Sequence, residues 1–392
     1  MSWLGRSKLP DVGTTIFTVM SRRAQALGAI NLGQGFPDYD IDPLLGELVA
    51  RAMRDGHNQY APMEGVAALR EGIAHKLEAS YGLRFDPQSE ITVTLGATEA
   101  IYSAIQAVVG AGDEVIAFDP AYDAYEPAVC LAGARCIRLP LLPPDFRYEW
   151  DRVCAAIGPR TRLILINSPH NPACTVATRA DLDELAAAIR GRDITVLSDE
   201  VYEHMVFDGR AHASVLANRE LRARSLAVFS FGKTLHATGL RVGYAVAPAA
   251  LTAELRKVHQ FNTFSIAHPL QHAIADYLLA RPGTGRGLAA FFQAKRDRLR
   301  AALAGSRLQL PPAQGTFFQL LDFSAVAPPG DAEFAERLLT EAGVASIPLS
   351  PFYAGPIRLS CVRLCIAKRD ATLDAAAERL AAFARRLERA GA

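Results

Sequence analysis

The sequence predicts an α/β fold, with a seven-stranded, mostly parallel sheet flanked by helices and a smaller α+β domain built from both chain ends. Between residues 90 and 247, short β-rich apolar runs alternate with helical, Ala-rich stretches, the pattern of buried parallel strands between helices. Half of the 392 residues are apolar, which suffices for two domains or one large core. Only residues 232–240 separate the last two runs, too few for a helical crossover, so we expect the last strand to pair antiparallel. The predicted strands are Ile91–Leu95, Glu114–Asp119, Arg135–Leu139, Leu163–Asn167, Ile194–Asp199, Leu226–Phe231 and Arg241–Ala247, with helices over 99–109 and 179–190.

The two ends of the chain differ in texture from this central stretch. Residues 1–40 are turn-rich and contain Asn31-Leu-Gly-Gln-Gly-Phe-Pro-Asp38, and we expect them to form an N-terminal arm. After Pro282, helical and strand-like stretches alternate in the manner of an α+β domain. We therefore expect a large domain over 41–281 and a small domain formed by the arm together with 282–392. The elements predicted after Pro282 are helices over 285–303, 332–342 and the C-terminus, and strands over 316–323 and 357–366.

Charge and hydropathy exclude several kinds of partner. Lys and Arg number 42 against 41 Asp and Glu, a net charge of +1, whereas nucleic-acid binders carry a basic excess on one face. No run approaches the roughly 18 apolar residues of a membrane span. Residues 1–8 lack the continuous apolar stretch of a signal peptide. We expect a cytoplasmic protein with neither nucleic acid nor membrane as partner.

A histidine pair is the only hint of a metal site in the sequence. His268 and His272 stand four residues apart on a predicted helix. No carboxylate or third histidine lies at motif distance, and two histidines do not make a zinc site. Packing or solvated histidines are therefore preferred, and no metal is expected.

Polar and small residues follow four of the predicted strands, at the edge where open α/β sheets bind ligands. Gly96-Ala97-Thr98 offers N–H groups and a hydroxyl to a phosphate, although an ordinary N-cap by Thr98 is the simpler interpretation. Asn171 stands outward in a rigid, proline-rich turn. Asp199 ends an apolar strand, where an unpaired carboxylate is costly, so we expect it to meet a buried cation. Lys233 follows another apolar strand, a setting that lowers a lysine pKa and makes the amine nucleophilic.

Lys233 has two competing interpretations. Gly232-Lys233-Thr234 resembles the end of a P-loop, but position 227 is Ala where that pattern needs Gly. A lone lysine behind a strand is usually solvated. All four strand ends together favour pyridoxal phosphate, which needs an amine for its aldehyde, a carboxylate for its pyridinium nitrogen, donors for its 3′-oxygen and a phosphate site.

Several motifs now make the chain resemble the fold-type-I pyridoxal-phosphate aminotransferases of class I/II over nearly its whole length. The motifs look most like those of the kynurenine/glutamine aminotransferase branch, and the sequence of residues 13–17, 58–63 and 231–234 is similar to that of bacterial methionine aminotransferases. Two departures are Cys174, where the branch commonly has Gly, and Leu240, where relatives often carry Trp. The motifs are Asn31-Leu-Gly-Gln-Gly-Phe-Pro, Asn58-Gln-Tyr-Ala-Pro, Asp199-Glu-Val-Tyr, Ser230-Phe-Gly-Lys-Thr and Val362-Arg-Leu-Cys-Ile-Ala-Lys368.

The resemblance implies catalytic and cofactor-binding roles for named residues. Lys233 forms the Schiff base with the cofactor, and Asp199 keeps the pyridinium nitrogen protonated. Tyr202 and Asn171 hold the 3′-oxygen, and Tyr122 stacks on the ring. The phosphate is bound by Ala97, Thr98, Ser230 and Arg241, with Tyr60 reaching it from the neighbouring subunit of a homodimer with shared sites.

The resemblance also implies the substrate contacts and the reaction. Arg363 grips the α-carboxylate with help from the Gly35 backbone and Asn171, and Phe17 faces the substrate side chain. An amino acid donates its α-amino group to a 2-oxo acid with ping-pong kinetics. No second arginine for a dicarboxylate is evident, while Phe17, Phe36 and Tyr122 are available, so a methionine or aromatic side chain is favoured.

Two other functions stay open at this point. A C–S β-lyase uses the same residues and differs in what leaves after α-proton loss. A cofactor-sensing module of a transcription regulator needs a DNA-binding domain, for which the roughly 30 residues before Asn31 are too few.

Overall fold

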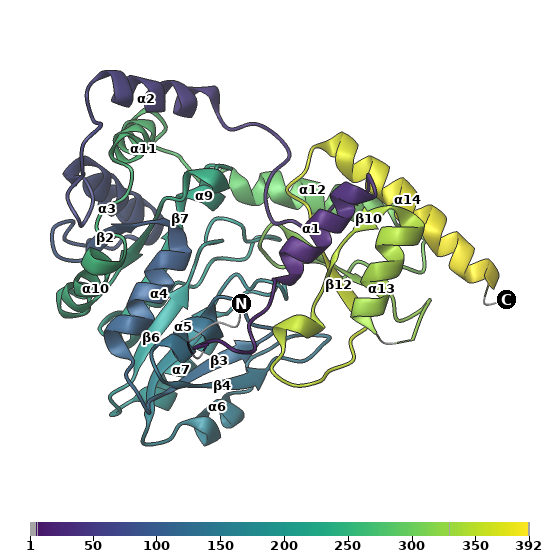
Figure 1. The fold of residues 1–392 in the computed structure, drawn as a ribbon, viewed down its shortest axis with the longest axis horizontal. Helices are drawn as coiled ribbons and strands as arrows, with labels where there is room; N and C mark the ends of the chain where they lie inside the picture. Colours follow the sequence, from purple (N-terminus) through teal and green to yellow (C-terminus); the bar gives the residue numbers. More distant parts are fainter. Residues whose placement is uncertain (1–4, 6, 329, 391–392) are drawn as a thin grey trace.

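The computed structural model describes residues 5, 7–328 and 330–390 (Figure 1). The expectation that residues 1–8 are not a signal peptide therefore concerns residues that lie largely outside the described part of the chain. A seven-stranded sheet has the order β2-β8-β7-β6-β5-β3-β4. β8 pairs antiparallel with both β7 and β2, as the short connection predicts, and the other pairs are parallel. All predicted strands are present with small shifts at their ends: β2 (Ile91–Thr94), β3 (Glu114–Asp119), β4 (Arg135–Pro140), β5 (Thr161–Asn167), β6 (Thr195–Asp199), β7 (Ser225–Ser230) and β8 (Gly243–Val246).

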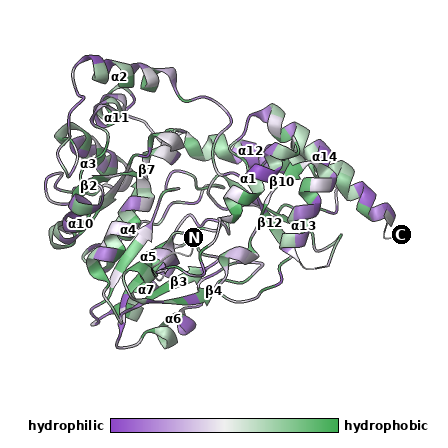
Figure 2. Ribbon diagram, in the orientation of Figure 1, coloured by the Kyte–Doolittle hydropathy of each residue, from purple (hydrophilic) through white to green (hydrophobic). Residues whose placement is uncertain are grey.

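Helices cover both faces of this sheet. On β3, Val115 and Ala117 pack into one apolar cluster with residues of α4, while Ile116 and Phe118 face the other cluster with Leu185 of α7. Figure 2 shows the hydrophobic colouring of these central strands, whereas the end of the C-terminal helix carries hydrophilic residues. None of the helices in the described part of the chain is long and apolar enough to cross a membrane. The α-helices between residues 41 and 281 are α2 (Pro43–Arg54), α3 (Ala67–Tyr81), α4 (Gly96–Val108), α5 (Tyr125–Leu131), α6 (Trp150–Ala156), α7 (Arg179–Ile189), α8 (Arg219–Arg222), α9 (Phe231–Thr234), α10 (Ala249–Asn262) and α11 (His268–Ala280).

Residues from the two ends of the chain pair in a second region. β1 (Ile30–Asn31) runs parallel to β10 (Val344–Ala345). A three-stranded antiparallel sheet has the order β11-β12-β9. The domain limits at residues 40 and 281 stay a prediction. The remaining elements are β9 (Phe318–Asp322), β11 (Ile347–Pro348), β12 (Cys361–Cys365), α12 (Leu288–Ala302), α13 (Asp331–Arg337) continued by a π-helical turn (Leu338–Ala342), and α14 (Asp370–Ala390).

The N-terminal arm, for which the sequence analysis predicted no helix, contains one. It contains α1 (Ile16–Ala26), which begins after Thr15, whose side chain accepts a hydrogen bond from the backbone of Thr18. Met20 and Ala24, one helical turn apart, are the buried residues of this helix. The turn-rich composition on either side hides this short apolar period.

Candidate active site

A cavity of about 230 Å³ lies where the strand ends of the large sheet face β12 and α1. The register explains why distant residues meet there, since Asn167 at the end of β5 is paired with Asp199 at the end of β6. Of the residues expected from the resemblance, all but Tyr60 line the cavity. They are Phe17, Gly35, Ala97, Thr98, Tyr122, Asn171, Asp199, Tyr202, Ser230, Lys233, Arg241 and Arg363.

Asp199 is a buried carboxylate with a phenol as its partner. Its side chain belongs to a residue only 5% exposed, and Oδ2 accepts a 2.6 Å hydrogen bond from the Tyr125 hydroxyl. Burial raises the pKa of Asp199 to about 6, against the lowering effect of the Tyr125 hydrogen bond. Tyr125 and the Val201 backbone are the donors to this carboxylate among the described residues, so the buried cation expected from the sequence, Lys233, acts on Asp199 through its charge and not through an ion pair. A protonated pyridine nitrogen fits such an acceptor.

Lys233 is half-buried among aromatic rings at the start of α9. Nζ lies 3.4 Å from the Gly35 carbonyl oxygen, 4.9 Å from the Phe317 ring centre and 5.6 Å from that of Tyr202. Desolvation lowers the pKa of Lys233 to about 8, as expected for an amine behind an apolar strand. Its amine can therefore lose a proton near neutral pH.

The start of α4 forms a cradle suited to a phosphate. The helix begins at Gly96 after Leu95, and no side chain caps it, so the N-cap role for Thr98 is wrong. A Cβ at Gly96 would lie 2.7 Å from Arg241 Nη2, and one at Gly243 would lie 2.7 Å from the Ala97 nitrogen. Only glycine allows this approach between the helix start, the arginine and β8, leaving backbone N–H groups and a guanidinium for an anion.

Arg363 of β12 is a buried cation on the opposite side of the cavity. The residue is 1% exposed; Nη1 donates to Asn171 Oδ1 at 2.6 Å and Nη2 to the Gly33 carbonyl at 2.9 Å. Its guanidinium carbon lies 3.7 Å from the Phe318 ring centre and 5.0 Å from that of Phe17. Nε has no hydrogen-bond partner, and no carboxylate of the described residues forms an ion pair with Arg363. A carboxylate ligand would satisfy it.

Asn171 links the two sides of the cavity. Its Oδ1 is used by Arg363, and its backbone N–H donates to Asn167 Oδ1 at 2.8 Å. The side-chain nitrogen is then the end left to donate to a ligand oxygen. In the turn that follows, Cys174 adopts φ 63°, a conformation that favours glycine, and its N–H donates to the His170 carbonyl. This left-handed backbone costs a non-glycine residue about 1–2 kcal/mol.

Two residues expected near the substrate or cofactor do not line the cavity, and two others that the sequence analysis did not name contribute to the site. Tyr60 is 83% exposed, packs edge-on against Phe264 and does not line the cavity. Phe36 is also absent from the lining, where Phe318 takes the expected aromatic place. Sequence reasoning missed Tyr125, the partner of Asp199. Its signal is the second tyrosine in Tyr122-Asp-Ala-Tyr125, since Tyr125 is the first residue of α5 and its ring contacts that of Tyr122.

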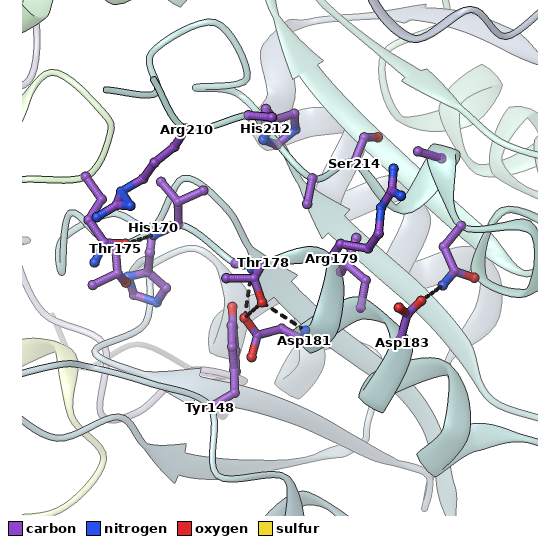
Figure 3. A pocket seen from close by; sticks show the side chains of 18 of the residues that line it. Tyr148, His170, Thr175, Thr178, Arg179, Asp181, Asp183, Arg210, His212 and Ser214 are labelled. Atoms are coloured by element: carbon purple, nitrogen blue, oxygen red, sulfur yellow. Dashed lines mark hydrogen bonds between the residues drawn. The ribbon is translucent and has the colours of Figure 1, made fainter. Parts of the chain in front are cut away.

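A larger cavity of about 950 Å³ lies beside the first and shares only Asn167 with it (Figure 3). None of the expected site residues lines it. Its labelled polar groups are partly paired with one another, as in the Thr178–Asp181 capping box at the start of α7. Size alone therefore does not decide between the two cavities, and the convergent buried charges with displaced pKa values make the smaller one the candidate active site.

Comparison with known proteins defines the class. The family model for class I and II aminotransferases matches residues 28–380, and the chain belongs to this family. It is therefore an aminotransferase that works with pyridoxal phosphate, and the donors around the smaller cavity fit that cofactor.

Individual members of this family are similar to the chain over nearly its whole length. The methionine aminotransferase of Escherichia coli K12 is 54% identical over 375 residues, which cover 96% of this chain and 97% of the relative. A solved Escherichia coli structure with an identified methionine aminotransferase function superposes with a TM-score of 0.95 over 97% of this chain and 100% of that one. N-succinyldiaminopimelate aminotransferase from Mycobacterium tuberculosis is 37% identical with a TM-score of 0.92, covering 97% and 100%. Human kynurenine–oxoglutarate transaminase 1 is 31% identical over 90% of this chain and 91% of its own.

Proposed function

We propose that this aminotransferase takes its amino group from methionine or another bulky apolar or aromatic amino acid and passes it to a 2-oxo acid. The observation that carries the proposal is the charge of the cavity. Among its lining residues, Arg363 is the one cation placed for a carboxylate once Lys233 and Arg241 serve the cofactor. Phe17, Phe318 and Ile101 supply apolar surface beside it. The similarity to Escherichia coli methionine aminotransferase supports the same preference.

Each residue then has a task in the reaction. Bound pyridoxal phosphate supplies an aldehyde that takes the amino group and a ring that withdraws electrons from the substrate Cα. Lys233 would hold the cofactor through its amine, and the same amine, when free, would take the α-proton of the substrate, a transfer favoured by a pKa of about 8. Asp199 would accept a hydrogen bond from the protonated pyridine nitrogen and so keep the proton there. Arg363 fixes the α-carboxylate and thereby the direction of the Cα–H bond.

The remaining cavity residues bind the other parts of the cofactor. Tyr122 would hold the ring, while the Tyr202 hydroxyl and the Asn171 amide would donate to the 3′-oxygen. The cradle at the start of α4 takes the phosphate, a role supported by its uncapped helix end. The phosphate-binding residues in this proposal are Ala97, Thr98, Ser230 and Arg241.

We also propose a homodimer in which Tyr60 serves the partner's phosphate site. Tyr60 lies outside its own cavity and is 83% exposed, and its ring neighbour Phe264 is 45% exposed, which is consistent with a surface that binds a partner. Mixing inactive Tyr60→Ala subunits with inactive Lys233→Ala subunits should restore activity in hybrid dimers that have one intact site. No recovery despite demonstrated subunit exchange would mean that Tyr60 serves its own chain or no site.

An amino-acid panel against several 2-oxo acids tests the proposed substrate class. Methionine or an aromatic donor should give the highest kcat/KM, and initial rates should show the parallel-line pattern of ping-pong kinetics. A preference for aspartate or glutamate would overturn the assignment. Pyruvate and ammonia formed without an oxo acid would indicate a C–S β-lyase, which no feature of the cavity favours.

A further inference from the structure

Three histidines from two distant segments meet outside the active-site cavity. His268 stands at the start of α11 and His272 one turn later, and the fold brings His57 from the segment after α2 against both. One ring nitrogen of each lies within 4.8 Å of the corresponding atoms of the other two. The sequence motif lacked a third histidine because that residue comes from the opposite end of the large domain.

The contacts of His268 orient it as a metal ligand. Its Nδ1 lies 3.0 Å from the Gln59 carbonyl oxygen, and since a carbonyl can only accept, Nδ1 carries the proton. The lone pair of a neutral His268 is therefore on Nε2. A backbone carbonyl that holds one ring nitrogen while the other faces the ion is the usual outer contact of a metal-bound histidine.

The spacing of the nitrogens suits a small divalent ion. His268 Nε2 and His272 Nε2 are 3.1 Å apart. In tetrahedral zinc coordination, the nitrogens of two imidazole ligands are separated by a similar distance of about 3.3 Å. The His57 ring stacks on that of His272 with a centre-to-centre distance of 3.6 Å and an interplanar angle of 16°, so His57 has to turn out of this stack for its nitrogen to point at the same ion. All three rings are half-buried, which leaves room for a water as fourth ligand.

The ligand types of the cluster favour a transition-metal ion. Three neutral imidazoles without a thiolate select borderline ions such as Zn²⁺ rather than Mg²⁺ or Ca²⁺. Asp276, one turn beyond His272 on the same helix, forms an ion pair with Arg51 and is therefore not counted among the ligands.

We propose that His57, His268 and His272 form a site for a divalent transition metal, with Zn²⁺ as the fitting ion. The ion would clip the segment after α2 to the first turn of α11. Backbone hydrogen bonds already hold that segment, from the His57 N–H to the Ala52 carbonyl and from the Asn58 N–H to the Gly56 carbonyl, so the third ligand is partly prearranged.

Chelator-treated holoenzyme without a polyhistidine tag provides the test, titrated with ZnCl₂ by calorimetry. One Zn²⁺ should bind per chain, and His57→Ala and His272→Gln should each weaken binding at least tenfold. His75→Ala, an exposed histidine on α3, is the matched control and should leave affinity unchanged. No binding to the wild-type holoenzyme, or cluster variants that bind Zn²⁺ as tightly as the wild type, would overturn the proposal.

X-ray absorption of the zinc-loaded holoenzyme separates this site from adventitious binding to the free cysteines. The proposed site predicts nitrogen and oxygen ligands at about 2.0–2.1 Å and no sulfur at about 2.3 Å. Bound Zn²⁺ should also raise the melting temperature of the wild-type holoenzyme but not that of His57→Ala. A sulfur shell, or an equal thermal shift in both proteins, would mean that the three rings are only a packed, hydrogen-bonded cluster.

Discussion

Burial has different effects on the ionisable groups of the two walls of the proposed active-site cavity. On the wall formed by the large sheet, burial moves Asp199 and Lys233 toward their neutral forms, with pKa values of about 6 and about 8. On the wall formed by β12, burial also lowers the pKa of Arg363, but a guanidinium starts so high that it stays charged. The first wall can exchange protons near neutral pH, and the second presents a fixed charge. Substitutions should therefore separate the chemistry from substrate binding.

Removing the amine from the sheet wall should have the largest effect. Lys233→Ala should lose at least about 10⁴-fold in turnover, because both the cofactor attachment and the base are gone. The phosphate and ring contacts remain, so some cofactor should still bind. Borohydride reduction and peptide mapping of the wild-type enzyme should place the cofactor on Lys233.

Two other lysines serve as controls for that assignment. Lys257 is exposed and paired with Glu254, while Lys368 is buried and donates to the Phe36 carbonyl. A cofactor adduct on either of them would contradict the assignment of the sheet wall.

Replacing the carboxylate of the sheet wall should have the second largest effect. Asp199→Asn keeps the size of the side chain but cannot hold a proton on the ring nitrogen, so turnover should fall at least about a hundredfold, or ~2.7 kcal/mol of barrier. Circular dichroism should show an intact fold. A loss of less than about tenfold would mean that the ring nitrogen does not depend on this residue.

The sequence predicted those site residues that stand next to a recognisable strand, and it missed those whose partners are remote in the chain. Asp199 and Lys233 stand directly behind their strands, so the strand pattern alone places them at one sheet edge. Arg363 was found only through the family resemblance, because no local pattern says that β12 faces this edge. Tyr125 and the third histidine, His57, were missed for the same reason, as their partners are remote in the chain.

A change on the β12 wall should alter substrate binding and leave the cofactor alone. Arg363→Lys keeps the charge but loses the fork that can grip a carboxylate with two hydrogen bonds. KM should rise about 10–100-fold for both the amino acid and the oxo acid, while cofactor affinity stays within about twofold. Steady-state kinetics and cofactor titration measure the two effects separately.

Arg358→Lys is the matched control, because Arg358 does not line the cavity. It should leave KM almost unchanged. If Arg358→Lys raised KM and Arg363→Lys did not, the carboxylate would bind elsewhere and the proposed division between the walls would fail.

The smallest effect is expected at Tyr125, which tunes the sheet wall without touching the substrate. Its hydroxyl donates to the charged form of Asp199 and so lowers the pKa of that carboxyl. Tyr125→Phe should raise this pKa from about 6 by about one pH unit, equivalent to ~1.4 kcal/mol. Cofactor-free enzyme binds the protonated pyridine best when Asp199 is ionised, so affinity is high above the pKa and falls as the pH drops through it.

In Tyr125→Phe that fall should begin at higher pH, which cofactor titrations between about pH 5 and pH 8 would show. Tyr148→Phe is the control, since its buried hydroxyl donates to the Asn167 carbonyl and not to Asp199. Its midpoint should match the wild type. A midpoint for Tyr125→Phe that stays in place or moves down would show that the phenol does not stabilise the ionised carboxylate, and that burial alone sets the proton affinity of the sheet wall.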